Sequence, residues 1–333
     1  MGFLHNLTFL LPVYNGGEEF KKLLKSLDDL NDQTNIIIYD DGSIDDSYRI
    51  ACAFGEPSKH KVRVIDGRKN RGYFRVIKIL LRICPTDFYM FLGHDDQLSN
   101  DFLEQFDVIT SEQRDIACIY TAIASMTPEG EIINTWPHFL RKDNAPDAIQ
   151  GREVLNTFHK HDWGNLFVAI WSKRVLNHTT LFQIMKCVPN SDLILPLKKI
   201  GFLNDNMSVL RALSHNADSM VFFKKTGEYL KGVDSGRLSE GRSHLNKGDV
   251  LRSPLGYLST VAHFMLPQIE QKGVATLWAL RYLYIYFGIT AKALLRHPGP
   301  FDVNEFFRGI GLILTGYAAN ISTATRMIGR RSS

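Results

Sequence analysis

Ile36-Ile37-Ile38-Tyr39-Asp40-Asp41-Gly42-Ser43 is an apolar run that ends in two adjacent carboxylates, a pattern that indicates a buried strand followed by a polar turn. A second apolar run, Phe88–Leu92, precedes Gly93-His94-Asp95-Asp96 in the same way. Short apolar runs bounded by turn residues are typical of strands. On this basis we expect further strands at Thr8–Leu11, Val62–Ile65 and Ala117–Ala124.

Helical patterns separate these expected strands. Phe20, Leu23, Leu24 and Leu27 recur at the spacing of one helix face. Ser43 with Asp46 forms a capping-box pattern that predicts the start of the next helix. Alternation of strands and helices indicates βαβ units, so we predict an α/β fold with a mostly parallel, doubly wound sheet and helices on both faces. Ligands of such sheets bind beyond the carboxyl ends of the strands.

The carboxylate pairs at two strand ends predict a cation and a ligand with phosphate groups. Asp40 with Asp41, and Asp95 with Asp96, place like charges side by side, which is unfavourable without a cation or hydrogen-bond donors. A divalent metal bound together with a nucleotide diphosphate supplies a cation. Oxygen ligands suit Mg²⁺ or Mn²⁺. Such an ion would neutralise charge on a departing diphosphate.

Four motifs in order resemble family 2 glycosyltransferases of GT-A fold, of the bacterial surface-polysaccharide type. They are Leu11-Pro12-Val13-Tyr14-Asn15, Asp40-Asp41-Gly42-Ser43, Asn70-Arg71-Gly72 and His94-Asp95-Asp96. The resemblance implies a Rossmann-like GT-A domain and an inverting, metal-dependent enzyme. It would transfer a sugar from a nucleotide diphosphate donor, expected to be a UDP-sugar, to a hydroxyl of a saccharide acceptor.

The resemblance also implies roles for single residues. Asp40 would hydrogen-bond the base, Arg71 would lie near the diphosphate, and Asp95 would contact the ribose or a donor hydroxyl. The full donor-binding set would be Pro12, Tyr14, Asn15, Asp40, Asp41, Arg71 and Asp95.

Metal binding would fall to Asp96, the last member of the family's Asp-x-Asp-like motif, in which His94 occupies the first place. His215 ends a segment that resembles the family's Arg-x-His, so it is a second candidate for the metal or the diphosphate. A purely structural histidine is the alternative.

Inverting transfer needs one base that takes the proton from the acceptor hydroxyl. The family places an acid there, commonly after Glu, and the matching stretch keeps Asp192 with Ser191 before it. We therefore predict Asp192 as the base. Two alternatives stay open: Asp192 caps the following helix, or Asp162 is the base. Trp136, Trp163 and Trp171 are candidates for stacking on sugar rings or for the core.

Three regions are expected along the chain: a catalytic domain at 1–225, a flexible linker at 226–249 rich in Gly, Ser and charge, and a helical region at 250–333. The last region carries nine Lys or Arg against three acids. Arg281 and Lys292 would form a polar stripe on one side of an apolar helix, Gly273–Leu295. Such helices can lie in the membrane interface. Packing on the catalytic domain or on another subunit, and a transmembrane hairpin, are the alternatives.

Composition narrows the remaining possibilities. A net charge of +4 gives no reason to expect nucleic acid, and four scattered cysteines argue against a zinc site or redox pair. We expect a cytoplasmic protein, peripheral on the inner face of the cell membrane, with a polyprenyl-diphosphate-linked acceptor by analogy with relatives. The sequence leaves the oligomeric state open. A nucleotidyltransferase and a non-catalytic scaffold that binds sugar nucleotides are the rival functions.

Overall fold

The computed structural model describes residues 5–126, 131–136, 145–157, 166–177, 209, 212, 213, 215–232, 262, 266, 272–296, 306, 307 and 309–319. The chain divides into two compact units. The first comprises Met1–Gly151, Phe158–Phe182 and Asp218–Gly236, and the second comprises Arg152–Thr157, Gln183–Ala217 and Arg237–Ser333.

The first unit contains the predicted parallel strands. These are β1 (Leu7–Val13), β2 (Asn35–Asp40), β3 (Lys61–Asp66) and β4 (Phe88–Phe91), in the spatial order β3-β2-β1-β4. All three neighbouring pairs are parallel, with Val13 opposite Asp40 and Asp40 opposite Asp66. Every residue of β1 and β2 is buried, which explains their continuous apolar sequences.

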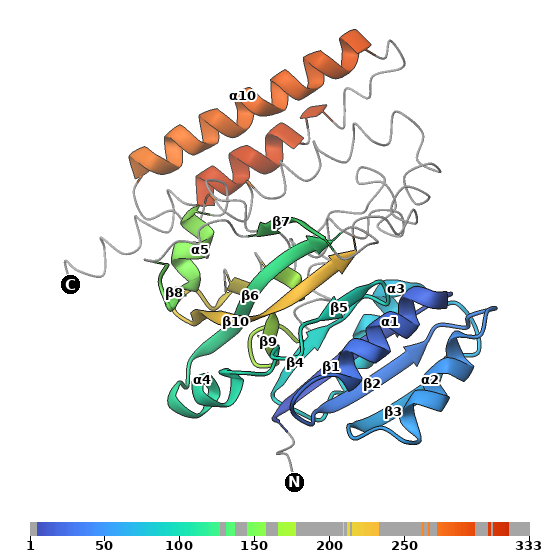
Figure 1. The fold of residues 1–333 in the computed structure, drawn as a ribbon. Helices are drawn as coiled ribbons and strands as arrows, with labels where there is room; N and C mark the ends of the chain where they lie inside the picture. The colour runs from blue at the N-terminus through green and yellow to red at the C-terminus, as the bar shows by residue number, and fades with distance from the viewer. Residues whose placement is uncertain are drawn as a thin grey trace. The chain divides into compact units, whose positions relative to one another are not determined.

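Three helices connect these strands: α1 (Gly17–Asp28), α2 (Ser47–Gly55) and α3 (Tyr73–Ile83). Phe20, Leu23, Leu24 and Leu27 of α1 are buried, as predicted. Helices α1 and α2 pack side by side, with α1 against β5 and α2 against β2 and β3 (Figure 1). Right-handed crossovers place α1 and α2 on one face of the sheet and α3 on the other, because the chain reverses direction across the sheet after β3. The switch point therefore lies between β1 and β4, where ligands of doubly wound sheets bind.

The sheet continues beyond β4 in the order β9 (Ile170–Ser172), β6 (Ile116–Met126), β10 (Met220–Gly232) and β5 (Asp96–Leu98). Strand β9 is antiparallel to both β4 and β6, whereas β6 and β10 are parallel. The sheet is thus parallel in its first four strands and mixed beyond them. Shorter elements complete the unit: α4 (Phe106–Glu112), β7 (Ile132–Trp136), β8 (Ala148–Gln150) and the 3₁₀ helix η2 (Leu166–Val168).

The predicted linker does not begin after residue 225, and this boundary is wrong. Strand β10 runs on to Gly232 because its second half pairs with both β6 and β5, and Tyr229 within it is only 1% exposed. Residues 226–232 therefore belong to the sheet. The rest of the predicted linker, 233–249, lies outside the described residues.

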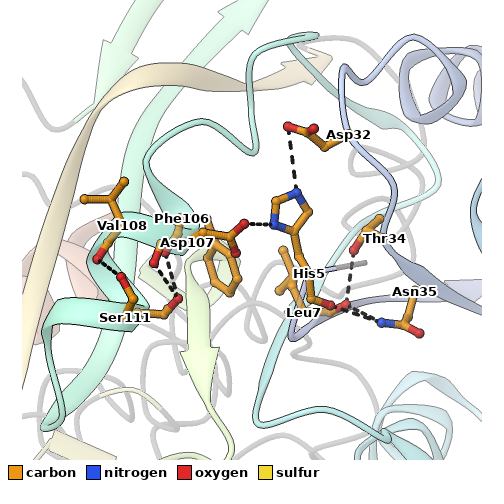
Figure 2. A network of polar contacts seen from close by, with 10 residues as sticks. His5, Leu7, Asp32, Thr34, Asn35, Phe106, Asp107, Val108 and Ser111 are labelled. Atoms are coloured by element: carbon orange, nitrogen blue, oxygen red, sulfur yellow. Dashed lines mark hydrogen bonds and ion pairs between the residues drawn. The ribbon is translucent and has the colours of Figure 1, made fainter. Parts of the chain in front are cut away.

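Polar contacts hold the edge of the sheet where β1 and β2 begin. The carbonyl oxygen of Leu7 accepts hydrogen bonds from Thr34 Oγ1 and Asn35 Nδ2, each at 3.1 Å. The buried ring of His5 lies between two carboxylates, with Nδ1 2.8 Å from Asp107 and Nε2 3.8 Å from Asp32 (Figure 2). This network ties α4 and the loop before β2 to the start of β1, at the edge opposite the strand ends that carry the predicted site.

The second unit contains α5 (Gly151–Thr157), apart from its first residue, which belongs to the first unit. It also contains two antiparallel helical segments, α10 (Lys272–Arg296) and residues 309–319. Thr276 Oγ1 and Tyr317 OH lie 2.8 Å apart, and the ring of Tyr286 lies 5.6 Å from that of Phe306. Arg281 is exposed on α10, and the polar stripe of Arg281 with Lys292 stays a prediction. In the described part of the chain, every helix is too short or too polar to span a bilayer.

Candidate functional site

The carboxyl ends of β1, β2, β3 and β4 meet at one edge of the first unit's sheet, because these strands are parallel and in register. The four sequence motifs follow these strand ends. The structure therefore gathers Tyr14, Asp40, the loop Asn70–Gly72 and the segment Gly93–Asp96 at the same edge. Tyr14 and Arg71 are exposed there, whereas Pro12 is buried within β1.

The loop after β1 is joined to the loop after β2 by reciprocal hydrogen bonds. The backbone N–H of Asn15 donates to Ser43 Oγ at 2.9 Å, and the N–H of Ile44 donates to Asn15 Oδ1 at 2.9 Å. Ser43 is thus a bridge between loops, and the predicted capping box is wrong: α2 begins at Ser47, and no side chain caps it from Asp46. Asn15 holds the two loops together. Its contact with the nucleotide-sugar donor stays a prediction.

Asp40 ends β2 with one carboxylate oxygen satisfied and the other free to accept. The side chain is 2% exposed, and Oδ2 accepts a hydrogen bond from the Ser43 N–H at 3.0 Å. Oδ1 is buried and has no hydrogen-bond partner among the described residues. An unpaired buried acceptor costs about 1–3 kcal/mol, so the site favours a ligand that brings an N–H or O–H donor.

Asp41 anchors the loop that carries Arg71. Its carboxylate is buried and accepts two backbone hydrogen bonds, from Arg71 N–H at 2.8 Å and from Gly72 N–H at 2.9 Å. Hydrogen bonds to an ionised group are the stronger kind. Both Asp41 oxygens are therefore engaged with the protein, which gives Asp41 a positioning role. Direct contact of Asp41 with the nucleotide-sugar donor stays a prediction.

Asp95 and Asp96 converge over Gly93 at the end of β4. A Cβ atom on residue 93 would lie 2.5 Å from Asp96 Oδ2 and 2.9 Å from Asp95 Oδ1, so a larger residue there would displace one or both carboxylates. Asp96 is 9% exposed, and its Oδ2 accepts a hydrogen bond from the Tyr229 hydroxyl. Burial, and after it the charge of Asp95, raises the pKa of Asp96 from 3.8 to about 7.

This pair of carboxylates fits a divalent cation. The carboxylates of Asp95 and Asp96 lie close together and Asp96 is buried, so it is unfavourable for both to be ionised. A divalent cation that prefers oxygen ligands would offset the repulsion between the two negative charges. The described residues contain no group of three or more His, Cys, Asp or Glu side chains arranged to hold a metal. Asp95 and Asp96 are the pair of carboxylates that the first unit brings together at this edge.

The other predicted residues belong to the second unit, to the core or to parts of the chain outside the described residues. His215 is exposed and belongs to the second unit, so its role at the metal stays a prediction. Asp192, the predicted base, and its rival Asp162 lie outside the described residues, as does Trp163. Trp171 is fully buried and its Nε1 donates to the Leu166 carbonyl at 3.1 Å, so it is a core residue.

Sequence reasoning missed Tyr229, the hydrogen-bond partner of Asp96. The two residues are 133 positions apart, and no motif surrounds Tyr229. It also missed Asp45, whose carboxylate accepts from the Gly17 N–H at 3.1 Å and the Ser47 N–H at 3.0 Å. Only Asp45 had a local signal, because an Asp two residues before a helix start commonly accepts from its first N–H groups.

Comparison with known sequences gives one family and two relatives. Residues 8–151 match the model of glycosyl transferase family 2. Teichoic acid poly(glycerol phosphate) polymerase of Staphylococcus epidermidis is 30% identical over 171 residues, covering 47% of this chain and 23% of that protein. Chondroitin synthase of Escherichia coli is 27% identical over 140 residues, covering 41% and 20%. The chain thus spans less than a quarter of the length of these curated relatives.

Solved structures share the fold. TarS of S. aureus, residues 1–349 in complex with UDP-GlcNAc, superposes with a TM-score of 0.60 at 13% identity, covering 93% of this chain and 81% of that one. The same protein in complex with UDP gives a TM-score of 0.52 at 13% identity, covering 89% and 94%. The fold predicted from the motifs, GT-A, is confirmed.

Proposed function

We propose that the protein transfers one sugar from a nucleotide diphosphate donor to a hydroxyl of a saccharide acceptor, since residues 8–151 match the model of glycosyl transferase family 2. The observation that carries the proposal is the pair of polar centres on the two sides of β1. Asp40 ends β2 with a free acceptor oxygen, and Asp95 with Asp96 follows β4 as a cation site. A nucleotide diphosphate has a base at one end and charged phosphates at the other.

The base is proposed to be uracil. The carboxylate of Asp40 can only accept hydrogen bonds, and its free oxygen is buried. The imide N–H of uracil is a donor of the required kind, as is the ring N–H of guanine, whereas the corresponding ring nitrogen of adenine and of cytosine is an acceptor. The binding of UDP-GlcNAc and UDP by TarS is consistent with a UDP-sugar donor for this chain.

The cation is proposed to be Mn²⁺ or Mg²⁺, held by Asp96 with Asp95 beside it and with His215 as a further candidate ligand. Oxygens of the donor diphosphate would complete the coordination. When bound, such an ion offsets the negative charge that develops on the leaving diphosphate. Asp41 holds the Arg71 loop at the same edge of the sheet, so Arg71 is proposed to contact the diphosphate.

Transfer with inversion is proposed to use Asp192 as the base. Its carboxylate would take the proton of the acceptor hydroxyl, the acceptor oxygen would bond to the anomeric carbon, and the bond from that carbon to the diphosphate would break on the opposite face. The protein's part is to orient both substrates so that the reacting atoms lie in line.

The acceptor is proposed to be a growing surface polysaccharide linked to polyprenyl diphosphate, at the inner face of the cell membrane. The names of the two relatives, a teichoic acid polymerase and a chondroitin synthase, support a polymer product. Leu277, Leu280, Tyr284 and Phe287 support a membrane-facing helix, since all four are exposed along α10, beside the exposed Arg281. The spacing of these four residues places them on one side of the helix.

A screen of nucleotide sugars tests the proposed activity. The purified protein is incubated with UDP- and GDP-sugars in Mn²⁺ or in EDTA, and nucleoside diphosphate release is measured. We expect Mn²⁺-dependent release of UDP from one UDP-sugar. Pyrophosphate release from a nucleoside triphosphate would instead identify a nucleotidyltransferase, and binding of UDP-sugars without any turnover would favour a scaffold.

A further inference from the structure

We propose that Tyr229 is a positioning residue that fixes the Asp96 carboxylate for the metal and the donor diphosphate; the inference rests on the proposed function. The Tyr229 hydroxyl donates a hydrogen bond to Oδ2 of Asp96. Tyr229 is 1% exposed and Asp96 is 9% exposed, so water does not compete for this contact.

A bulge in β10 brings Tyr229 to this position. Phe223 pairs with Tyr120 of β6, and the next pair is Glu228 with Ala122, so residues 224–227 of β10 face the single residue Thr121. Bulges next to active sites commonly redirect a side chain. Without the extra residues, the alternation of side chains and the register along β10 would carry Tyr229 to a different place along β6 and β5.

The bulge packs against residues 99–102, which follow Asp96 in the chain. Gly227 has a φ of 76°, and a Cβ atom there would lie 2.7 Å from the Cα of Phe102. Its N–H donates to Asp101 Oδ2 at 3.1 Å, and the N–H of Glu228 donates to Ser99 Oγ at 2.7 Å. Since β5 begins at Asp96 and ends at Leu98, these contacts fix Tyr229 relative to Asp96.

Strand pairing completes the alignment. In the antiparallel pair of β10 with β5, Tyr229 lies opposite Leu98 and Lys231 lies opposite Asp96. Tyr229 and Asp96 are therefore diagonal neighbours on one face of the sheet. A phenol is well suited to this place, because it donates one hydrogen bond without adding a positive charge that would repel the cation. Partners of metal ligands of this kind commonly contribute about 10–100-fold to metal affinity.

Tyr229→Phe tests the inference, because it removes the hydroxyl and keeps the ring. Tyr89→Phe is a matched control: Tyr89 is equally buried, and its hydroxyl donates to the Leu176 carbonyl at 2.6 Å instead of to a site residue. Binding of Mn²⁺ in the presence of UDP is measured by electron paramagnetic resonance of free Mn²⁺. Binding of UDP in EDTA and thermal unfolding of the metal-free protein report whether each variant is folded.

We expect Tyr229→Phe to weaken Mn²⁺ binding by about tenfold or more. The same variant should bind UDP in EDTA as the wild type does, and Tyr89→Phe should retain wild-type Mn²⁺ affinity. Equal Mn²⁺ affinity of Tyr229→Phe and the wild type would overturn the inference and leave the proposed function standing. Equal weakening in both variants would also overturn it, because general loss of packing would then be the cause. If the wild type bound neither UDP nor Mn²⁺, the proposed function would fail, and this inference with it.

Discussion

At the scale of single residues, the site rests on carboxylates that differ in what surrounds them. Asp41 has both oxygens engaged with backbone N–H groups, Asp40 has one oxygen engaged, and Asp96 accepts a hydrogen bond from the Tyr229 phenol and has a raised pKa. The three side chains are all buried. These unequal surroundings suit different roles: Asp41 holds a loop, Asp40 has a buried oxygen without a hydrogen-bond partner among the described residues, and Asp96 is the proposed ligand of the cation.

Asp40→Asn should weaken UDP binding. Asp40 accepts from the Ser43 N–H and, in the proposed complex, from the base as well. An Asn side chain has one oxygen and can accept in one of these places only, so its NH₂ group faces a donor in the other. We expect a loss of about 1–3 kcal/mol, roughly 5- to 150-fold in affinity, measured by calorimetry with UDP in EDTA.

The control for this substitution is Asp66→Asn, at the end of the neighbouring strand β3. Asp66 is exposed, and its Oδ1 accepts from the Arg68 N–H at 2.7 Å. This variant should bind UDP as the wild type does. Unchanged UDP affinity in Asp40→Asn would show that the base binds elsewhere.

Asp96→Asn should stabilise the metal-free protein at alkaline pH. The folded-state pKa of Asp96 is raised to about 7, so its stabilising contribution is present below its ordinary value of 3.8 and is lost as the pH rises through 7. At pH 8 the wild type carries a buried, ionised carboxylate, which the variant lacks. Thermal unfolding in EDTA should show a higher midpoint for the variant at pH 8 and a smaller difference at pH 5. A lower midpoint at pH 8 would contradict this assignment.

At the scale of elements, a carboxylate in the loop after β2 holds the loop that follows β3. Asp41→Ala should release the loop Asn70–Gly72, because it removes two charge-assisted hydrogen bonds worth about 1.5–3 kcal/mol each. We expect faster tryptic cleavage after Arg71, followed by mass spectrometry of the fragments. The matched control is Asp45→Ala, which also removes two backbone contacts, those with the N–H groups of Gly17 and Ser47 at the starts of α1 and α2. Equal cleavage rates in the two variants would contradict the positioning role of Asp41.

The elements that could be predicted from the sequence are those whose signal is local. The apolar runs of β1, β2, β3, β4 and β6 and the apolar face of α1 predict those elements, and the motif residues after four of the strands mark one sheet edge. The capping box at Ser43 failed because the hydroxyl is used by a different loop. The bulge of β10 and the contact of Tyr229 with Asp96 depend on strand pairing between distant segments, and no local pattern encodes such pairing.

At the scale of the whole molecule, the exposed apolar side of α10 supports the proposed membrane contact. Replacing Leu277 and Tyr284 by Glu should reduce sedimentation of the protein with vesicles that contain phosphatidylglycerol, because both side chains are more than half exposed and would face the lipid. Val108→Glu is the control, since Val108 is a 57% exposed apolar residue on α4 of the first unit. Unchanged vesicle binding in the double variant would leave α10 as a surface for protein contacts.

The central claim is that Asp40 and Asp96 bind the two ends of one nucleotide diphosphate. A crystal structure of the protein with UDP and Mn²⁺, with the metal located by its anomalous scattering, tests it most directly. The account predicts uracil hydrogen-bonded to Asp40 Oδ1 and Mn²⁺ on the Asp96 carboxylate, with the diphosphate between them. Uracil bound away from Asp40, or Mn²⁺ bound away from Asp96, would contradict it.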